Sequence, residues 1–362
     1  MDATVKSTLK EGIYSRAKAD KLDLILPLLN GLTRKHADGC EPYGAILSAR
    51  SQTPGSATSL EDLPYIPVRL FKTHYLRSVP EDEVFKTLTS SGTTGQAVSR
   101  IVLDKETASL QTHVMVSIMQ HFLGKARLPM LVIDHPGVVR SRESFSARGA
   151  GILGMANFGH RPKYVLKDET MDIDDEVLDA FIEANSGREV FLFGFTFMVW
   201  RYFIQALQKR GRSIDLSKGV LVHSGGWKKL EAEKVSNSHF KAEVEAWTGI
   251  KRVHNFYGMV EQVGSLFVEC REGHLHAPVY SDIIVRDPMT LEPLPHGLEG
   301  IVQVVSVLPE SYPGHSLLTE DKGTILGEDD CDCGMKGRYF AISGRLPKAE
   351  VRGCSDTFEK AA

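Results

Sequence analysis

The sequence predicts an α/β protein whose chain ends in a smaller β-rich part. Between residues 107 and 247, short apolar runs alternate with segments whose apolar residues recur at helical spacing. This alternation predicts a largely parallel sheet covered by helices, because parallel strands need crossover connections and are buried on both faces. From Val279 the pattern changes, since apolar runs at 283–285 and 301–307 are separated by Pro- and Gly-rich turns without a helical segment.

The individual elements follow from the same periodicities. Lys21–Leu32 has a helical apolar stripe despite Pro27, and Ser51–Pro64 reads as an exposed connection. Further helices are predicted at 107–122, 177–182, 199–207 and from Lys228 to about Trp247, and strands at 130–133, 190–193 and 220–222. We therefore expect an N-terminal helical segment at 1–64, an α/β core at 65–278, a β-rich subdomain at 279–353 and a short tail at 354–362.

Composition favours an ordinary soluble globular protein, with 42% hydrophobic and 25% charged residues among 362. A net charge of −3 gives no electrostatic reason to expect nucleic acid or an anionic membrane as partner. The first ten residues lack the apolar core of a signal peptide, and no apolar run has the length needed to span a bilayer. We expect a cytoplasmic protein without membrane insertion.

A loop of hydroxyl residues and glycines is the most informative stretch. It lies between two extended segments, Val84–Leu88 and Ser99–Leu103, and contains Ser90, Ser91, Gly92, Thr93, Thr94 and Gly95. Such a backbone can bend tightly and turn several N–H groups toward one point, which suits phosphate oxygens. It is not a Walker loop, because no Lys follows the second glycine. A flexible Ser/Gly/Thr linker is the alternative that these residues leave open.

Four shorter motifs follow along the chain. Gly225-Gly226-Trp227 comes after a predicted strand, and Tyr257, Gly258 and Glu261 place an aromatic ring, a glycine and a carboxylate within one turn. Asp321 ends a strand-like run at Leu318–Asp321, and Gly344-Arg345 is followed by Arg352-Gly353. Taken alone, the motif around Glu261 and the run Leu318–Asp321 are each more often a turn or a solvated acid than a binding site.

In this order, from about Tyr65 to Gly353, the motifs resemble those of the adenylate-forming superfamily of acyl- and aryl-CoA ligases, adenylation domains and luciferase-like enzymes. The resemblance implies the large N-terminal domain of those enzymes, with ATP and Mg²⁺ as cofactors. Ser90–Gly95 would be the phosphate loop, and Gly225-Gly226-Trp227 would hold the adenine. Tyr257 would pack on the adenine, Glu261 would help to hold Mg²⁺, Asp321 would bind the ribose hydroxyls and Arg345 would contact the nucleotide from the hinge motif.

The C-terminal end departs from the superfamily, whose members continue beyond the hinge as a mobile lid carrying a Lys. Only Cys354–Ala362 remain here, so we expect the lid to be absent. This arrangement is similar to the LuxE-type acyl-protein synthetases, the long-chain-fatty-acid–protein ligases of bacterial fatty acid reductase systems. In that family a cysteine near the C-terminus accepts the activated acyl group. The resemblance gives this role to Cys354 and implies a fatty acid substrate and an acyl reductase subunit as partner.

The chemistry fits this resemblance. Attack of a carboxylate on the α-phosphate of ATP makes an acyl-adenylate, and a thiolate can then displace AMP to form a thioester. Arg345, Lys348 and Arg352 precede Cys354 and would lower the pKa of its thiol. A free Cys on a frayed tail is the alternative for this residue. For the whole protein, the alternatives are a CoA-ligase-like enzyme that transfers the acyl group to a diffusible thiol or carrier protein, and a non-catalytic partner subunit.

The cysteines also predict a metal site. Five of them, an odd number in a long chain, favour metal binding or thiol chemistry over a disulfide framework. Cys331-Asp332-Cys333 is a tight pair, and Cys270 precedes His274 and His276; thiolates and an imidazole satisfy the tetrahedral preference of zinc. Phenylacetate–CoA ligase-like relatives show a similar set, and His276 resembles their Leu-His pair, so we predict a structural Zn²⁺ held by Cys270, His276, Cys331 and Cys333. Four reduced residues in surface turns are the alternative.

Overall fold

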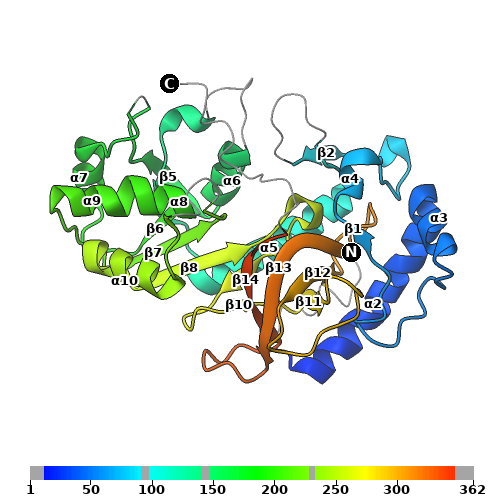
Figure 1. Cartoon of the computed structure of the whole chain (residues 1–362). Helices are drawn as coiled ribbons and strands as arrows, with labels where there is room; N and C mark the ends of the chain where they lie inside the picture. The colour runs from blue at the N-terminus through cyan, green and yellow to red at the C-terminus, as the bar shows by residue number, and fades with distance from the viewer. Residues whose placement is uncertain (1–11, 91–97, 140–146, 169, 228–232, 347–362) are drawn as a thin grey trace. The chain divides into compact units, whose positions relative to one another are not determined.

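The computed structural model describes residues 12–90, 98–139, 147–168, 170–227 and 233–346 (Figure 1). The described residues form two compact units. The first unit contains the chain up to Ile118 and again from Gly258, and the second contains Met119–Tyr257. Both units mix helices and strands, which confirms the predicted α/β class.

The second unit is built on five parallel strands. They are β4 (Leu128–Val132), β5 (Gly159–Tyr164), β6 (Val190–Phe195), β7 (Gly219–Ser224) and β8 (Arg252–Tyr257), in the spatial order β8-β7-β6-β4-β5. Every residue of β6, the central strand, is buried, as expected for a parallel strand covered on both faces. The predicted parallel arrangement is therefore confirmed for this unit.

Helices flank these strands (Figure 1). They are η2 (Pro136–Val139), α6 (Ala147–Ala156), α7 (Asp175–Ala184), α8 (Thr196–Met198), the π-helix η3 (Val199–Ile204), α9 (Gln205–Arg210) and α10 (Asn237–Thr248). The last helix was expected to begin at Lys228. This prediction was wrong for residues 234–236, which are not helical. Ser236 caps α10 instead, because its hydroxyl accepts a hydrogen bond from the His239 N–H.

The N-terminal part of the first unit is mainly helical. It contains α2 (Lys18–Gly39), α3 (Glu41–Ala49), β1 (Ile66–Pro67), α4 (Leu70–Thr73), η1 (Glu81–Glu83), β2 (Lys86–Thr89), β3 (Arg100–Leu103) and α5 (Lys105–Leu123). The boundary of this part, at Ile118, falls within α5. Helix α2 runs through Pro27, as predicted. The expected exposure of residues 51–64 was wrong for Leu60 and Leu63, whose side chains are buried in the core.

The rest of the first unit is an antiparallel sheet. Its strands are β9 (Phe267–Glu269), β10 (Leu275–His276), β11 (Ser281–Arg286), β12 (Gly300–Ser306), β13 (Ser316–Glu328) and β14 (Arg338–Arg345), in the order β11-β12-β13-β14-β10-β9. Strand β1 pairs in parallel with β13. The strand expected to end at Asp321 continues to Glu328, because β12 and β14 both pair with β13 beyond that residue.

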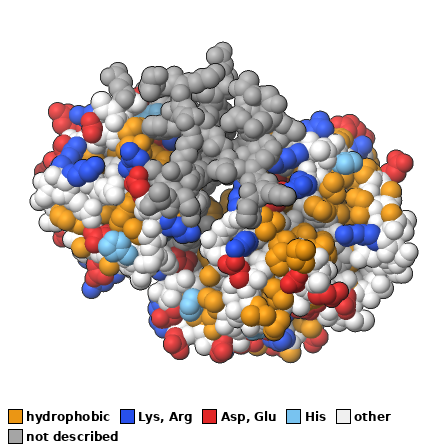
Figure 2. All heavy atoms as spheres, in the orientation of Figure 1, with side chains coloured by type: hydrophobic (Ala, Val, Ile, Leu, Met, Phe, Trp, Pro, Cys, Tyr) orange, Lys and Arg blue, Asp and Glu red, His pale blue; other side chains and the backbone are white. Residues whose placement is uncertain are grey.

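Figure 2 shows acidic and basic side chains interspersed on the visible face, with apolar side chains between them. This distribution agrees with the near balance of 43 basic and 46 acidic residues in the sequence. Among the residues that the structure describes, no helix combines the length and apolar composition needed to cross a bilayer.

Candidate nucleotide and metal sites

The base of the predicted phosphate loop is a β-hairpin. Strands β2 and β3 pair antiparallel, with Thr89 opposite Arg100. Beyond them, the Ser90 N–H donates to the Ser99 carbonyl oxygen at 3.1 Å, and the Ser99 N–H donates to Ser90 Oγ at 2.8 Å. The two serines thus close the hairpin at the point where the loop begins and ends. The rest of the predicted loop, Ser91, Gly92, Thr93, Thr94 and Gly95, lies outside the described residues.

Glu261 lies in a short 3₁₀ turn, Val260–Gln262, and is only 7% exposed. Burial raises the pKa of its carboxyl group, whereas the Ser99 hydroxyl and the positive charges of Lys72 and Arg345 act in the opposite direction. The ionised carboxylate is therefore costly in the metal-free protein, and a divalent cation beside it would stabilise that form. Through Ser99, this carboxyl group lies next to the base of the hairpin loop.

Asp321 and Arg345 face each other across the β13–β14 ladder. The Arg345 Nε–H donates to Asp321 Oδ1 at 3.0 Å. The Asp321 side chain is 13% exposed and the Arg345 side chain 46% exposed, so solvent reaches both groups. The adjacent carboxylate of Glu320 pairs with Arg69 at 2.8 Å. The pair thus offers a carboxylate acceptor and a guanidinium donor at an accessible position of the sheet.

The other predicted nucleotide-binding residues lie around the second unit. Gly225 has a φ of +89°, a conformation that favours glycine, and Gly226 follows it after β7. Trp227 is 8% exposed, and its ring packs edge-on against Trp200 with centroids 6.0 Å apart. Tyr257 is the last residue of β8.

Gly258 is the first residue of the second chain segment that belongs to the first unit. A Cβ atom at Gly258 would lie 2.9 Å from Leu266 Cδ2, so a side chain at this position would require Leu266 to shift. Cys354, together with Lys348 and Arg352, lies outside the described residues.

The four predicted zinc ligands converge. One ligand atom from each of Cys270, His276, Cys331 and Cys333 lies within 4.8 Å of all the others. The Sγ atoms of Cys270 and Cys331 are 3.9 Å apart, and Cys333 Sγ lies 3.3 Å from His276 Nε2. A tetrahedron with Zn–S bonds of about 2.3 Å has S···S edges of about 3.8 Å. The residues therefore fit a tetrahedral zinc ion by both donor type and spacing.

Strands and tight turns hold this cluster in place. The Cys270 N–H donates to the His274 carbonyl oxygen at 2.8 Å, closing the turn between β9 and β10. Tyr339 on β14 stacks on the rings of His276 and His274, with centroids 5.5 and 4.9 Å apart. His274 Nδ1 lies 3.4 Å from Cys331 Sγ, but His274 is not a member of the convergent set. The imidazole of His274 is therefore placed to orient the Cys331 sulfur from outside the set of four ligands.

Sequence reasoning missed three residues around Glu261. They are Ser99, Lys72 and Tyr312, whose hydroxyl donates to the Glu261 carbonyl oxygen at 2.9 Å. Ser99 had a usable signal, since it is the hydroxyl residue that begins the second extended segment. Lys72 and Tyr312 had none, because they are far from Glu261 in sequence.

Comparison with known proteins finds two ligases that are similar to this chain. The chain is 22% identical over 309 residues to a long-chain-fatty-acid–luciferin-component ligase of Vibrio harveyi, covering 83% of this chain and 79% of that protein. It is 21% identical over 312 residues to the ligase of the same name from Aliivibrio fischeri, covering 82% and 78%.

Among solved structures, an open conformation of 2-hydroxyisobutyryl-CoA ligase in complex with 2-HIB-AMP and CoA matches with a TM-score of 0.67 at 16% identity, covering 92% of this chain and 76% of that chain. The same ligase in its thioesterification state matches with a TM-score of 0.65 at 17% identity, covering 92% and 69%. These likenesses concern the fold, and they confirm the predicted adenylate-forming architecture. The family model described as "Acyl-protein synthetase, LuxE" matches residues 27–362, so the chain belongs to the LuxE family of acyl-protein synthetases.

Proposed function

We propose that this protein activates a long-chain fatty acid with ATP and then carries the acyl group as a thioester on Cys354, for delivery to an acyl reductase. Membership of the LuxE family makes it an ATP-dependent acyl-activating ligase. The observation that carries the adenylation step is the position of Glu261, buried beside the Ser99 end of the hairpin loop and within the electrostatic influence of Lys72 and Arg345. The fatty acid comes from the names of the Vibrio and Aliivibrio relatives.

In the first step a fatty acid carboxylate oxygen bonds to the α-phosphorus of ATP, and the bond from that phosphorus to pyrophosphate breaks. Glu261 would hold a Mg²⁺ ion, which neutralises phosphate charge when bound. Asp321 would accept hydrogen bonds from the ribose hydroxyls. Arg345 would donate to phosphate oxygens as negative charge develops on them. In this assignment Glu261 and Arg345 meet ligand groups of opposite charge, and Asp321 meets hydroxyl groups that donate hydrogen bonds to it.

In the second step the Cys354 thiolate bonds to the acyl carbon, and the bond from that carbon to AMP breaks. AMP leaves with the electron pair, and the thiol proton passes to solvent. A thiolate is the most nucleophilic side-chain group for this attack, once deprotonated. The resulting thioester would keep the acyl group activated for reduction.

Intact-mass measurement after incubation with ATP, Mg²⁺ and fatty acids of several lengths tests the overall proposal. We expect a mass increase of one acyl group that hydroxylamine removes. Cys354→Ser should keep ATP–pyrophosphate exchange and lose the label. A label that persists in this variant would move the acceptor to another thiol. Exchange without any protein label would instead favour transfer to a diffusible thiol or carrier, and the absence of exchange would favour a non-catalytic subunit.

Replacing Glu261 tests the adenylation site. Glu261→Gln keeps the size of the side chain and removes its charge, so we expect Mg²⁺-dependent pyrophosphate exchange to fall by about two orders of magnitude or more. The far-ultraviolet circular dichroism spectrum should stay unchanged. Unchanged exchange in this variant would remove Glu261 from the site.

We also propose that Cys270, His276, Cys331 and Cys333 hold a structural zinc ion. The support is the convergence of three sulfur atoms and one imidazole nitrogen at tetrahedral spacing. Four protein ligands leave no open position, so the ion would tie the β9–β10 turn to the β13–β14 connection without taking part in the chemistry.

Elemental analysis of protein purified without chelator should find one zinc per chain. His276→Ala should lose the zinc, whereas His274→Ala, the matched control two residues away, should retain it. Protein without stoichiometric zinc would contradict the proposal, and zinc retained in His276→Ala but lost in His274→Ala would reverse the assignment of the histidines.

A further inference from the structure

The connection between β12 and β13 is buried, which is unusual for a loop. Ser311, Tyr312 and His315 are each 0% exposed. Loops normally lie on the surface because their main-chain polar groups need water as a partner. A buried connection must therefore find its partners within the protein. We call residues 309–315 the buried connection.

Part of that bonding is to the turn that carries Glu261. The Tyr312 hydroxyl donates to the Glu261 carbonyl oxygen at 2.9 Å. The Gln262 side-chain amide donates to the Gly314 carbonyl oxygen at 2.7 Å and to the Val304 carbonyl oxygen at 3.2 Å. A Cβ atom at Gly314 would lie 2.9 Å from the Glu261 carbonyl oxygen, so the two backbones are in close contact. The buried connection thus forms hydrogen bonds with the main-chain carbonyl group of Glu261 and with the side chain of Gln262.

The buried connection is itself anchored on other elements of the first unit. Ser311 Oγ donates to Thr107 Oγ1 at 2.6 Å and accepts from the Asp104 N–H at 3.1 Å, next to the start of α5. The Gln111 side-chain amide of α5 donates to the Tyr312 hydroxyl at 3.4 Å. The Tyr312 ring packs edge-on against Phe71 with centroids 5.9 Å apart. Tyr312 therefore has a fixed position from which to orient its partner.

The Glu261 turn needs such support. It is a three-residue 3₁₀ turn, whose hydrogen bonds are poorer than those of an α-helix, and the Gln262 N–H reaches the Met259 carbonyl oxygen only at 3.2 Å. A carboxyl group whose direction is fixed in advance needs no reorganisation when it binds a cation. A hydrogen bond to the carbonyl oxygen of the same residue fixes the main chain from which that side chain projects.

We propose that Tyr312 is a positioning residue for Glu261, and that its hydroxyl orients the Glu261 carboxylate toward Mg²⁺. The inference rests on the proposed role of Glu261 in holding that ion. Tyr312 does not touch the nucleotide or the metal in this proposal; it acts through the main chain of Glu261. Gln262 contributes in the same way from the next residue.

The test is the Mg²⁺ dependence of ATP–pyrophosphate exchange in Tyr312→Phe, which removes only the hydroxyl. We expect the Mg²⁺ concentration for half-maximal exchange to rise about tenfold or more, as for other groups that orient a metal ligand. Tyr43→Phe is the matched control. Its buried hydroxyl lies 3.4 Å from His315 Nε2 of the same connection but does not contact Glu261. Tyr43→Phe should keep the wild-type Mg²⁺ dependence even if its melting temperature falls as much.

The outcomes separate this inference from the proposed function. If Glu261→Gln loses exchange while Tyr312→Phe and Tyr43→Phe show the same Mg²⁺ dependence, the positioning role is overturned and the role of Glu261 stands. If Glu261→Gln keeps wild-type exchange, both are overturned. Gln262→Met provides a second variant, because it removes the amide donor to Gly314 and leaves the tyrosine intact. A smaller shift of the Mg²⁺ dependence in the same direction supports the inference, and an unchanged dependence in both Gln262→Met and Tyr312→Phe overturns it.

Discussion

The two ends of the β13–β14 ladder each carry a carboxylate opposite an arginine, in different surroundings. At one end Glu328 is in register with Arg338, and at the other Asp321 is in register with Arg345. The side chains of the first pair are 10% and 8% exposed. In the second pair the arginine side chain is 46% exposed. The same pairing on the same two strands thus produces one buried and one accessible ion pair.

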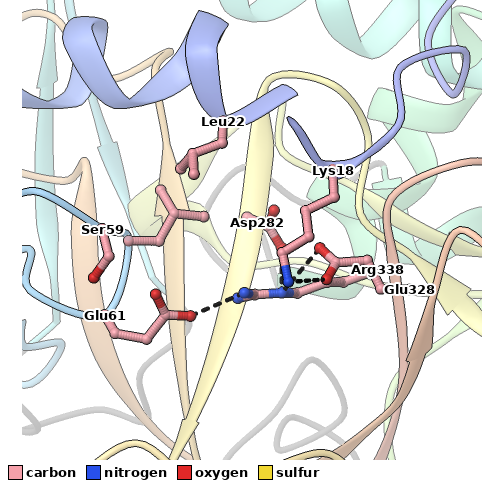
Figure 3. Close-up of a pocket in the computed structure, with 8 residues that line it drawn as sticks. Lys18, Leu22, Ser59, Glu61, Asp282, Glu328 and Arg338 are labelled. Carbon is pink, nitrogen blue, oxygen red and sulfur yellow. Dashed lines mark hydrogen bonds and ion pairs between the residues drawn. The ribbon is translucent and has the colours of Figure 1, made fainter. Parts of the chain in front are cut away.

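The buried pair belongs to a dense ionic network (Figure 3). Arg338 donates to Glu61 Oε1 at 2.9 Å and to the Ile283 carbonyl oxygen at 2.8 Å, and its Nε lies 3.3 Å from Glu328. Lys21 of α2 pairs with Asp282 of β11 at 3.0 Å, with both side chains almost fully buried. The network therefore joins α2 to the sheet.

The difference between the two ends indicates their roles. The guanidinium of Arg338 is enclosed by carboxylates and a carbonyl group. Removing one partner of such a buried ion pair lowers the free energy of unfolding strongly, because the other charge is left buried without compensation. The guanidinium of Arg345 keeps a face toward solvent, where its planar set of donors suits phosphate oxygens. We therefore attribute a stabilising role to the buried end, and the exposure of Arg345 is compatible with its proposed contact to the nucleotide.

The largest effect on stability should come from the buried end. Arg338→Met would leave three nearby carboxylates without their shared cation, and breaking a buried ion pair from one side costs about 3–5 kcal/mol. The denaturant midpoint should fall accordingly. Lys18→Met is the control in the same network, because Lys18 pairs with Glu328 at 3.0 Å but its own side chain is 60% exposed. Equal losses in the two variants would contradict the distinction between buried and accessible pairs.

A smaller effect should appear as a pH dependence. Burial alone would raise the pKa of Asp282, but the charges of Lys21 and Arg338 and the Ile283 N–H hold that pKa below its ordinary value of 3.8. Because the folded-state pKa is lower than the unfolded one, the Asp282 carboxylate contributes stability that is complete above about pH 4 and is lost as the pH falls through the folded-state pKa.

Asp282→Asn lacks this titrating group. Its free energy of unfolding should be lower than that of the wild type near neutral pH, and the gap should narrow below about pH 3.8. The measurement is a series of denaturant titrations over pH. A gap that stays constant down to the acid transition would show that Asp282 does not change its protonation with folding.

The sequence predicted the elements whose residues repeat a local pattern. The buried parallel strands β4, β6 and β7 read as apolar runs, whereas the more polar β5 and β8 were missed. The cysteines and His276 were recognisable because few residue types bind zinc. The full length of β13 was missed, because Thr319, Glu320 and Asp321 interrupt its apolar pattern while pairing with neighbouring strands sustains it. Lys21–Asp282 and Tyr312–Glu261 were missed because each partnership joins residues distant in the chain and leaves no local signal.

The smallest effect on stability, and the most informative comparison, is expected at the accessible end. Arg345 pairs with Asp321, and Arg69 pairs with the neighbouring Glu320 at 2.8 Å. The Arg69 side chain is 65% exposed, so both pairs are open to solvent and each is worth at most about 1 kcal/mol of stability. Arg345→Met and Arg69→Met should therefore have denaturant midpoints close to that of the wild type.

Activity should separate these two variants, because only Arg345 is assigned to the nucleotide. Arg345→Met should lower ATP–pyrophosphate exchange at least about tenfold, since a charge-assisted contact to a phosphate contributes more than 1.4 kcal/mol when it acts in the transition state. Arg69→Met should exchange at the wild-type rate. Because the two arginines have adjacent carboxylate partners and similar exposure, a general electrostatic effect would lower both rates. Equal rates in the two variants would therefore place the accessible end of the ladder outside the nucleotide site.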